Sequence, residues 1–348
     1  MVKVQKNTVL TVLLLLLCPN SVWMDSVSLI KKPIINELAD FKKLFDSSLS
    51  SSNTLLDSVI AHIRQRNGKM MRPILSLLVA RLYGPIRLST LHAAVSLELL
   101  HTASLVHDDV VDESSERRGQ LSVNASFNNK VAVLTGDYLL ATSLVHAGLT
   151  MNHDIIQVIS SLGQELADGE LLQLSNVSTH TFSETVYFDV IRKKTAALFA
   201  ACTKAAALSM GAGEKEVEKA RLLGEYIGIC FQIKDDIFDY SDSKEIGKPT
   251  GNDMEEGKLT LPVLYVLNTT EDPKAVETAI RVKDGVATPD EIEFLVSFTK
   301  EKGGIEYAFR TMEGYRQKAA DILASMPSLP DVSEALNSFL DYVVEREK

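Results

Sequence analysis

Two groups of aspartates with the same spacing are the residues of this sequence that could most directly do chemistry. Each group places carboxylates at positions i, i+1 and i+4: Asp108, Asp109 and Asp112 in the first, and Asp235, Asp236 and Asp239 in the second. On one helix face, two such charges roughly 6 Å apart repel by about 3 kcal/mol at an effective dielectric near 20. A divalent cation would turn this cost into a gain, and oxygen-only ligands favour Mg²⁺.

Acidic runs also have a simpler interpretation, because they usually form a solvated helix face or a helix end. Either group taken alone is compatible with that interpretation. Here, however, each group closes an apolar helix-like segment, 91–106 in one case and 222–238 in the other. Carboxylates at a helix C-terminus also oppose the macrodipole and need compensation. We therefore predict metal binding at both groups.

Cationic residues near the first aspartate group could bind a diphosphate. Arg117 and Arg118 follow that group and offer forked donors, although a lone diarginine is usually a surface pair. Lys69 and Arg72 lie one turn apart at the start of a predicted helix, where phosphate also gains from free backbone N–H groups. His101, two turns before the aspartates, lies on nearly the same face, although an isolated histidine there is usually a hydrogen-bonded core residue.

Helices are the elements that must position these residues. From Met24 onward, apolar residues recur with a period near 3.6, and almost no alternating strand pattern is present. Gly and Pro fall mostly between the periodic segments, which supports their boundaries. We predict one all-α domain, residues 24–348, with helices near 33–47, 53–66, 73–84, 88–109, 130–150, 153–175, 183–210, 214–241, 260–268, 273–282, 289–302, 303–325 and 331–346.

The two helices that end at the aspartate groups are apolar nearly all round, which is typical of helices at the centre of a bundle. The second contains Gly224 and Gly228 one turn apart. Each glycine costs about 1 kcal/mol relative to alanine in a helix. We therefore expect another helix or a ligand to approach the backbone closely at this point.

Composition excludes some classes of partner. The formal net charge of -10 leaves no excess of Lys and Arg to meet nucleic-acid phosphates, so nucleic acid is not an expected partner. The cysteines, Cys18, Cys202 and Cys230, show no metal-ligand or disulfide spacing, which fits a reducing cytoplasm.

Residues 1–23 form an apolar N-terminal extension with two interpretations. The apolar run 9–18 follows two lysines and resembles a signal peptide, but a bilayer span needs about 20 residues. The alternative is an over-extended start with Met24 as the true initiator. We prefer this alternative and predict a cytoplasmic protein, because the rest of the chain is typical of one.

Taken together, these motifs resemble the trans-isoprenyl diphosphate synthase family. Segment 98–119 is similar to the first aspartate-rich region of that family, and segment 231–239 is similar to the second. Further similar segments follow in the family's order and spacing: 136–140, 169–173, 193–196 and 247–262. The resemblance covers roughly residues 30–345. It departs from the family pattern at Asn67, Met70 and Met71, beside Lys69 and Arg72.

The resemblance implies an all-α isoprenoid synthase fold, a helical bundle around a central catalytic cavity, and a homodimer. It implies about three Mg²⁺ ions held by Asp108, Asp109, Asp112, Asp235 and Asp236, with Asp239 a weaker candidate acting through water. The residues implied to bind isopentenyl diphosphate are Lys69, Arg72, His101 and Arg118. Those implied to surround the allylic diphosphate are Arg117, Lys194, Thr195, Gln232, Lys248 and Lys258, and we count Lys194 among the catalytic residues.

The reaction implied by the resemblance is sequential head-to-tail condensation of isopentenyl diphosphate onto farnesyl or geranyl diphosphate. The allylic diphosphate leaves, the cation alkylates isopentenyl diphosphate away from water, and the released diphosphate takes the proton. Ala103 and Ser104, just before Asp108, are small where short-chain members often place an aromatic ring. We therefore predict a long-chain all-trans product such as octaprenyl diphosphate. Loose membrane association would suit the release of so hydrophobic a product, although no amphipathic basic helix supports it.

Several alternatives share this fold. A terpene cyclase generally lacks the second complete aspartate group and the Lys69 and Arg72 site, and a head-to-head synthase lacks that site. A non-catalytic regulatory subunit of a heteromeric prenyl synthase tends to lose the aspartates, and this chain has all six. A geranylgeranyl or farnesyl diphosphate synthase differs only in product length and stays open as an alternative.

Overall fold

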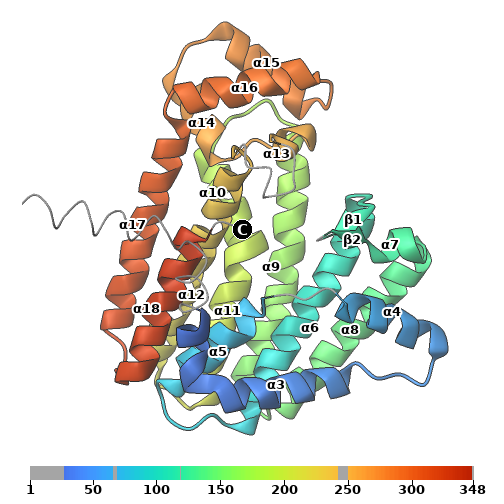
Figure 1. Ribbon diagram of the computed structural model, residues 1–348, viewed down its shortest axis with the longest axis vertical. Helices are drawn as coiled ribbons and strands as arrows, with labels where there is room; N and C mark the ends of the chain where they lie inside the picture. The colour runs from blue at the N-terminus through green and yellow to red at the C-terminus, as the bar shows by residue number, and fades with distance from the viewer. Residues whose placement is uncertain (1–26, 66–68, 118, 242–249, 347–348) are drawn as a thin grey trace, which may run out of the picture.

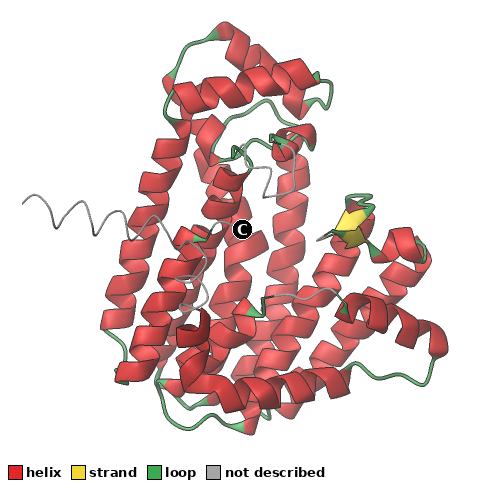
Figure 2. Cartoon of the chain, viewed as in Figure 1, coloured by secondary structure: helices red, strands yellow, loops and turns green. Residues whose placement is uncertain are grey.

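A computed structural model of the chain describes residues 27–65, 69–117, 119–241 and 250–346. The predictions for residues 1–23, Asn67, Arg118 and Lys248 lie outside these ranges. Helices make up nearly all of the described structure, which confirms the predicted all-α class (Figures 1 and 2).

The first half of the described chain supplies the first helices of the bundle and one short hairpin. Its elements are η1 (Lys32–Ile34), α3 (Ile35–Ser48), α4 (Thr54–Arg64), α5 (Met71–Arg81), α6 (Leu88–Val111), β1 (Glu116–Arg117), β2 (Gln120–Leu121), α7 (Val123–Ser126), α8 (Asn129–Leu149) and α9 (His153–Val177). The two short strands pair antiparallel.

The second half completes the bundle and adds a small group of helices at one end. Its elements are α10 (Glu184–Ile191), η2 (Arg192–Ala196), α11 (Ala197–Ser209), α12 (Glu214–Phe238), α13 (Asn252–Glu255), α14 (Leu261–Thr269), α15 (Pro273–Lys283), α16 (Pro289–Glu301), α17 (Gly304–Ala324) and α18 (Pro330–Glu345). Helices α15 and α16 lie at the top of the molecule, away from α3 at the bottom (Figure 1).

Helices α6 and α12 lie inside the bundle, as their apolar sequences predicted. Helix α6 packs against α8, α5 and α11, and α12 packs between α11 and α17. Most side chains of the middle of α6, including Val95, Leu97 and Leu99, are almost fully buried. The two aspartate groups are therefore carried on rigid central helices, which suits a site that must hold its geometry.

The glycines of α12 are confirmed as points of close helix approach. A Cβ atom at Gly224 would lie 2.4 Å from the backbone oxygen of Phe199, and one at Gly228 would lie 2.5 Å from Cα of Ala196. Both distances are too short for a real side chain. Glycine at these positions lets α12 lie directly against η2 and α11.

The predicted single helix at 183–210 is interrupted. The structure has α10, then the π-helical turn η2, then α11. Helix α9 also comes very close here, since a Cβ atom at Gly169 would lie 2.8 Å from Cβ of Lys193 and 3.0 Å from the amide nitrogen of Lys194. A π turn widens the helix locally, and such turns are frequent at functional sites.

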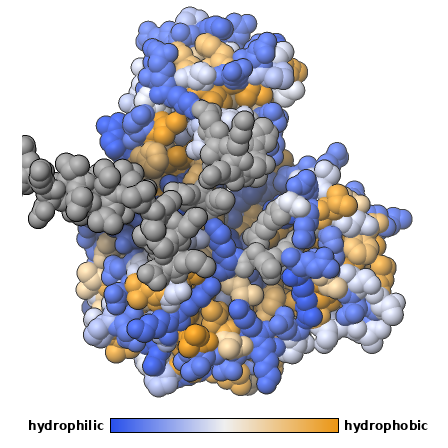
Figure 3. Space-filling view, in the orientation of Figure 1, coloured by the Kyte–Doolittle hydropathy of each residue, from blue (hydrophilic) through white to orange (hydrophobic). Residues whose placement is uncertain are grey.

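Helix α8 has an unusual surface. It is long and apolar enough to cross a membrane by length and composition, with 39% of that window buried. One such helix is weak evidence for a span, because core helices of soluble proteins pass the same test. Apolar side chains are visible on the surface near α7 and α8 (Figure 3).

Candidate active site

Asp109 of the first aspartate group connects the end of α6 to the hairpin and α7. Its side chain is fully buried and forms an ion pair with Nε of Arg117 from β1. Its backbone oxygen accepts a hydrogen bond from Nδ2 of Asn124 at 3.1 Å. The same aspartate therefore holds Arg117, one of the predicted phosphate ligands, in place.

Asp108, near the end of α6, is influenced by charged residues of η2 and α9. The pKa of Asp108 is raised to about 6, mainly by burial; the charge of Lys194 acts to lower it, and the charges of Glu170 and Asp112 act to raise it. Nζ of Lys194 lies 2.5 Å from Oε2 of Glu170. These effects bring the first aspartate group into electrostatic reach of η2 and α9.

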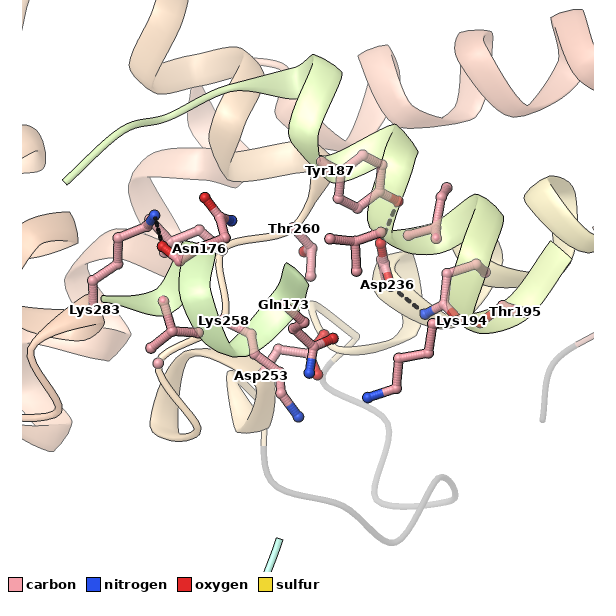
Figure 4. Close-up of a pocket in the computed structure, with 16 residues that line it drawn as sticks. Gln173, Asn176, Tyr187, Lys194, Thr195, Asp236, Asp253, Lys258, Thr260 and Lys283 are labelled. Carbon is pink, nitrogen blue, oxygen red and sulfur yellow. Dashed lines mark hydrogen bonds between the residues drawn. The ribbon is translucent and has the colours of Figure 1, made fainter. Parts of the chain in front are cut away.

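Asp236 of the second group is the end of a hydrogen-bonded chain. Its carboxylate accepts a hydrogen bond from the Tyr187 hydroxyl at 2.5 Å and another from Nε2 of Gln232 at 2.8 Å. The Thr195 hydroxyl in turn donates to Oε1 of Gln232 at 2.7 Å. Burial raises the pKa of Asp236 well above its ordinary value, and the charge of Asp253 adds to this effect. Figure 4 shows the hydrogen bond between Tyr187 and Asp236.

Asp239 has a different role in the structure. Its carboxylate accepts hydrogen bonds from the backbone amides of Asn252 at 2.9 Å and Asp253 at 3.2 Å. It therefore fixes the start of α13, and with it the position of Asp253 near Asp236.

One cavity gathers four of the residues predicted for the allylic diphosphate: Lys194, Thr195, Gln232 and Lys258. Its lining also includes Asp236 and Asp253 (Figure 4). Burial lowers the pKa of Lys258, but its hydrogen bond to Glu256 and the charges of Asp112 and Asp253 outweigh burial and leave the pKa raised. The influence of Asp112 on Lys258 connects the first aspartate group to this cavity.

A second cavity gathers Lys69, Arg72 and His101, predicted for isopentenyl diphosphate, together with Arg117, which was predicted for the allylic diphosphate. Its lining also includes Asp235 and Arg346. The Arg72 guanidinium lies 5.0 Å from the centre of the Phe199 ring, and Nζ of Lys69 lies 5.6 Å from the centre of the Tyr342 ring. Aromatic faces of this kind hold cations in place without neutralising them.

Arg346 is a residue of this cavity that the sequence analysis missed. It is only 7% exposed, and its Nη2 atom lies 2.6 Å from the Asp235 carboxylate and 2.9 Å from the backbone oxygen of Phe231. Its guanidinium carbon lies 4.0 Å from the centre of the Phe231 ring. Arg346 is the last residue of the predicted helix 331–346 and a lone arginine, so no local pattern marked it.

Tyr187 and Asp253 were also missed as site residues. Asp253 lies within the family-like segment 247–262, so the resemblance could have supplied it. Tyr187 lies in an amphipathic helix with no motif around it. Only its contact with Asp236, 49 positions away, reveals its role.

The two small residues before Asp108 lie above a packed apolar region. Ala103 is 2% exposed, and the hydroxyl of the partly buried Ser104 donates to the backbone oxygen of His101 at 2.9 Å. Further along α6, an apolar cluster joins α6, α8, α9 and α11, with Leu97, Leu100, Ile155, Ile159 and Leu162 among its members.

The family model for polyprenyl synthetases matches residues 53–297. The chain belongs to the polyprenyl synthetase family. This confirms the resemblance to trans-isoprenyl diphosphate synthases, and as a member of this family the chain is a prenyltransferase. Heptaprenyl diphosphate synthase component 2 of Geobacillus stearothermophilus is 37% identical over 294 residues, which cover 84% of this chain and 90% of that protein. Octaprenyl diphosphate synthase of Escherichia coli is 33% identical over 303 residues, covering 86% and 93%.

Solved structures of polyprenyl synthetases share the fold. Geranylgeranyl pyrophosphate synthase from Bacteroides thetaiotaomicron is 68% identical, with a TM-score of 0.82 and coverage of 92% of this chain and all of that one. Polyprenyl synthase from Caulobacter crescentus, complexed with calcium and isoprenyl diphosphate, is 30% identical, with a TM-score of 0.86 and coverage of 92% and 98%. The isoprenoid synthase fold predicted for this polyprenyl synthetase is thereby confirmed.

Proposed function

We propose that this polyprenyl synthetase is a Mg²⁺-dependent long-chain trans-polyprenyl diphosphate synthase that adds isopentenyl diphosphate to an allylic diphosphate. The observation that carries the proposal is the placement of two aspartate groups at the ends of α6 and α12, beside a cavity containing Lys194 and Lys258. Carboxylates and cations arranged in this way suit a metal-bound diphosphate that leaves during the reaction.

The carboxylates fit Mg²⁺ by their chemistry. Asp108 is partly buried and Asp236 is buried; both carboxylates have raised pKa values, and each has a further carboxylate near it. A divalent cation would relieve this repulsion, and all the donors are hard oxygens. Among the residues that the structure describes, no three His, Cys, Asp or Glu side chains converge enough to hold a metal alone. We infer that the substrate diphosphate completes the coordination, since Mg²⁺ is often bound by few carboxylates plus phosphate.

The candidate metal ligands are the six aspartates of the two groups, Asp108, Asp109, Asp112, Asp235, Asp236 and Asp239. When bound, Mg²⁺ would neutralise the charge of the leaving diphosphate. Lys194 and Lys258 supply further positive charge beside the allylic diphosphate, and the Thr195 hydroxyl orients the carboxamide of Gln232 toward Asp236. In the second cavity, Lys69 and Arg72 hold the diphosphate of isopentenyl diphosphate close by.

The reaction follows from this arrangement of charge. The allylic C–O bond breaks as the diphosphate leaves, and the double bond of isopentenyl diphosphate attacks the resulting allylic carbon. A C–C bond forms, and the proton lost from isopentenyl diphosphate goes to the released diphosphate. Exclusion of water by the apolar core below Asp108 protects the cation from hydrolysis.

We propose a product longer than C20, with octaprenyl diphosphate as the central expectation. Small side chains at Ala103 and Ser104 support this proposal, as do the names of curated relatives, which include heptaprenyl, octaprenyl and nonaprenyl synthases. The 68% identical structure carries the name geranylgeranyl pyrophosphate synthase, so C20 is the competing expectation.

Metal removal tests the chemistry. With the full chain, radiolabelled isopentenyl diphosphate and farnesyl diphosphate, incorporation should stop in EDTA and return with excess Mg²⁺. Because the pKa of Asp108 is raised to about 6, the Mg²⁺ concentration for half-maximal rate should rise as pH falls below that value. Chromatography of the dephosphorylated products gives their length. Incorporation that persists in EDTA would contradict the metal requirement, and no incorporation with any allylic primer would favour a regulatory subunit.

We also propose a homodimer in which α8 of one copy packs on the other. Large apolar side chains are exposed on and just after this helix: Leu134 at 68%, Leu144 at 51%, Val145 at 61%, Leu149 at 50% and Met151 at 90%. An exposed apolar surface of this kind marks an interaction site. A second copy fits the implied homodimer, whereas a membrane surface is the alternative occupant.

Charged substitutions on α8 test this interface. Leu134→Lys with Leu144→Lys should convert a dimer to a monomer, because two lysines would be buried without partners. Light scattering after size-exclusion chromatography measures the mass. Val286→Lys, at a 55% exposed apolar residue outside α8, is the control and should stay dimeric. A wild-type monomer that binds phospholipid vesicles would instead favour the membrane.

A further inference from the structure

Lys283 is a buried lysine that the reaction described above does not use. It is the last residue of α15 and is 6% exposed. Its Nζ atom donates to three backbone oxygens, those of Asn176 at 3.0 Å, Thr179 at 2.9 Å and Thr181 at 2.8 Å. A lysine ammonium has three N–H donors, and each one here has an acceptor.

These acceptors lie at and just beyond the C-terminal end of α9. The last carbonyls of a helix have no partner within the helix and carry the negative end of its dipole. A buried cation at this point satisfies both the carbonyls and the dipole. Burial lowers the pKa of Lys283. The three hydrogen bonds offset this effect by favouring the charged form.

The end of α9 is part of the wall that surrounds the allylic-diphosphate cavity. Gln173, one turn before Asn176, lines the cavity and donates to Glu170 at 3.3 Å. Glu170 in turn pairs with Lys194. Figure 4 shows Lys283 bonded to Asn176 at one end of the cavity, with Lys194 at the other.

The loop that carries Lys258 packs against the C-terminal ends of α9 and α15. A Cβ atom at Gly257 would lie 3.4 Å from Cγ1 of Val177 and 3.4 Å from the backbone oxygen of Val282. The positive φ of 76° at Gly257 also requires glycine. Any shift of α9 relative to α15 would therefore move the loop as well.

A second contact holds the segment after α9 to the end of α15. Nε2 of His180 lies 2.8 Å from the carboxylate of Asp284, the residue after Lys283. Both side chains are about half exposed, so this pair contributes little. The buried ammonium is the stronger of the two connections.

We propose that Lys283 is a positioning residue for the allylic-diphosphate site, acting through the C-terminal end of α9 and the loop before Lys258. This inference rests on the proposed function, since it assigns the cavity to the allylic substrate. Loss of the ammonium should remove the link between the end of α15 and the backbone at the end of α9, and let Glu170, Lys194 and Lys258 lose their alignment. The second cavity, with Lys69 and Arg72, lies on other elements and should be unaffected.

Lys283→Met tests the proposal because methionine keeps an unbranched apolar stem and removes the charge. The KM for farnesyl diphosphate should rise about tenfold or more, as expected for the loss of charge-assisted hydrogen bonds. The KM for isopentenyl diphosphate should change less than twofold. Lys283→Arg keeps the positive charge and should recover part of the loss. Lys274→Met, on the same helix beside the Phe294 ring, is the control and should behave as wild type.

Hydrogen exchange separates failure of this proposal from failure of the proposed function. In Lys283→Met, and in the milder Lys283→Gln if the first variant does not fold, backbone amides at 173–183 should exchange faster than in wild type. Unchanged exchange there, or an equal rise in both KM values, would overturn the positioning role. An inactive wild type would overturn the proposed function. Faster exchange in the variant would then still support the role of Lys283 in holding the C-terminal end of α9.

Discussion

Replacing Asp236 by asparagine should lower kcat by a factor of about 10²–10³ or more, the loss typical of removing one preorganised electrostatic group. Asparagine keeps the shape and the hydrogen-bonding reach of the side chain but lacks the negative charge that a bound cation needs. Asp236 is 3% exposed, so solvent can compensate little for the loss of its negative charge. Initial rates of radiolabelled incorporation at saturating Mg²⁺ give the comparison.

Two controls distinguish charge from structure. Tyr187→Phe removes the hydroxyl that donates to Asp236 but keeps the carboxylate, so its loss in kcat should be about tenfold at most. Circular dichroism should show the same helical content in both variants. Wild-type activity in Asp236→Asn would remove this residue from the proposed metal site. Asp108→Asn should repeat the large loss from the first aspartate group.

Replacing Ala103 by tyrosine should shorten the product to the C15–C20 range. Ala103 is 2% exposed and lies on α6 in the main apolar core, one turn after Leu99. A ring at this position would block the path that a growing tail must follow. Overpacking of a well-filled core typically costs about 1–3 kcal/mol, so the variant should still fold.

The product ladder decides this prediction. Dephosphorylated products of wild type should extend beyond C20, and those of Ala103→Tyr should not. Ser104→Ala removes only a hydroxyl and should leave the ladder unchanged. An unaltered ladder in Ala103→Tyr would show that this residue is not in the path of the tail. A wild-type ladder ending at C20 would make the protein a geranylgeranyl diphosphate synthase.

The parts of the fold that could be predicted are those that depend on local pattern. The apolar sequences of α6 and α12 predicted central helices, and Gly224 and Gly228 predicted a close approach that the structure confirms. Helix starts also follow local rules: Asn152 caps α9, and Thr288 with Glu291 forms a capping box at α16.

The parts that could not be predicted depend on contacts between distant residues. Asp236 accepts a hydrogen bond from Tyr187, 49 positions away, and Asp235 pairs with Arg346, 111 positions away. Neither pairing has a spacing that sequence could reveal. The hairpin of β1 and β2 is too short to show an alternating pattern, and the segment containing α13 is set in part by Asp239.

The π turn between α10 and α11 has a consequence for how this segment can change over evolution. Tyr187 and Thr195 both join the hydrogen-bonded chain that ends at Asp236. Eight residues of regular α-helix make about 2.2 turns, which would leave these two side chains roughly 80° apart. The wider turn at η2 reduces that difference, and both side chains bond residues of α12, Tyr187 to Asp236 and Thr195 to Gln232. Selection should therefore preserve the number of residues between Tyr187 and Thr195 as strictly as their identities, and tolerate substitutions there better than single-residue insertions or deletions.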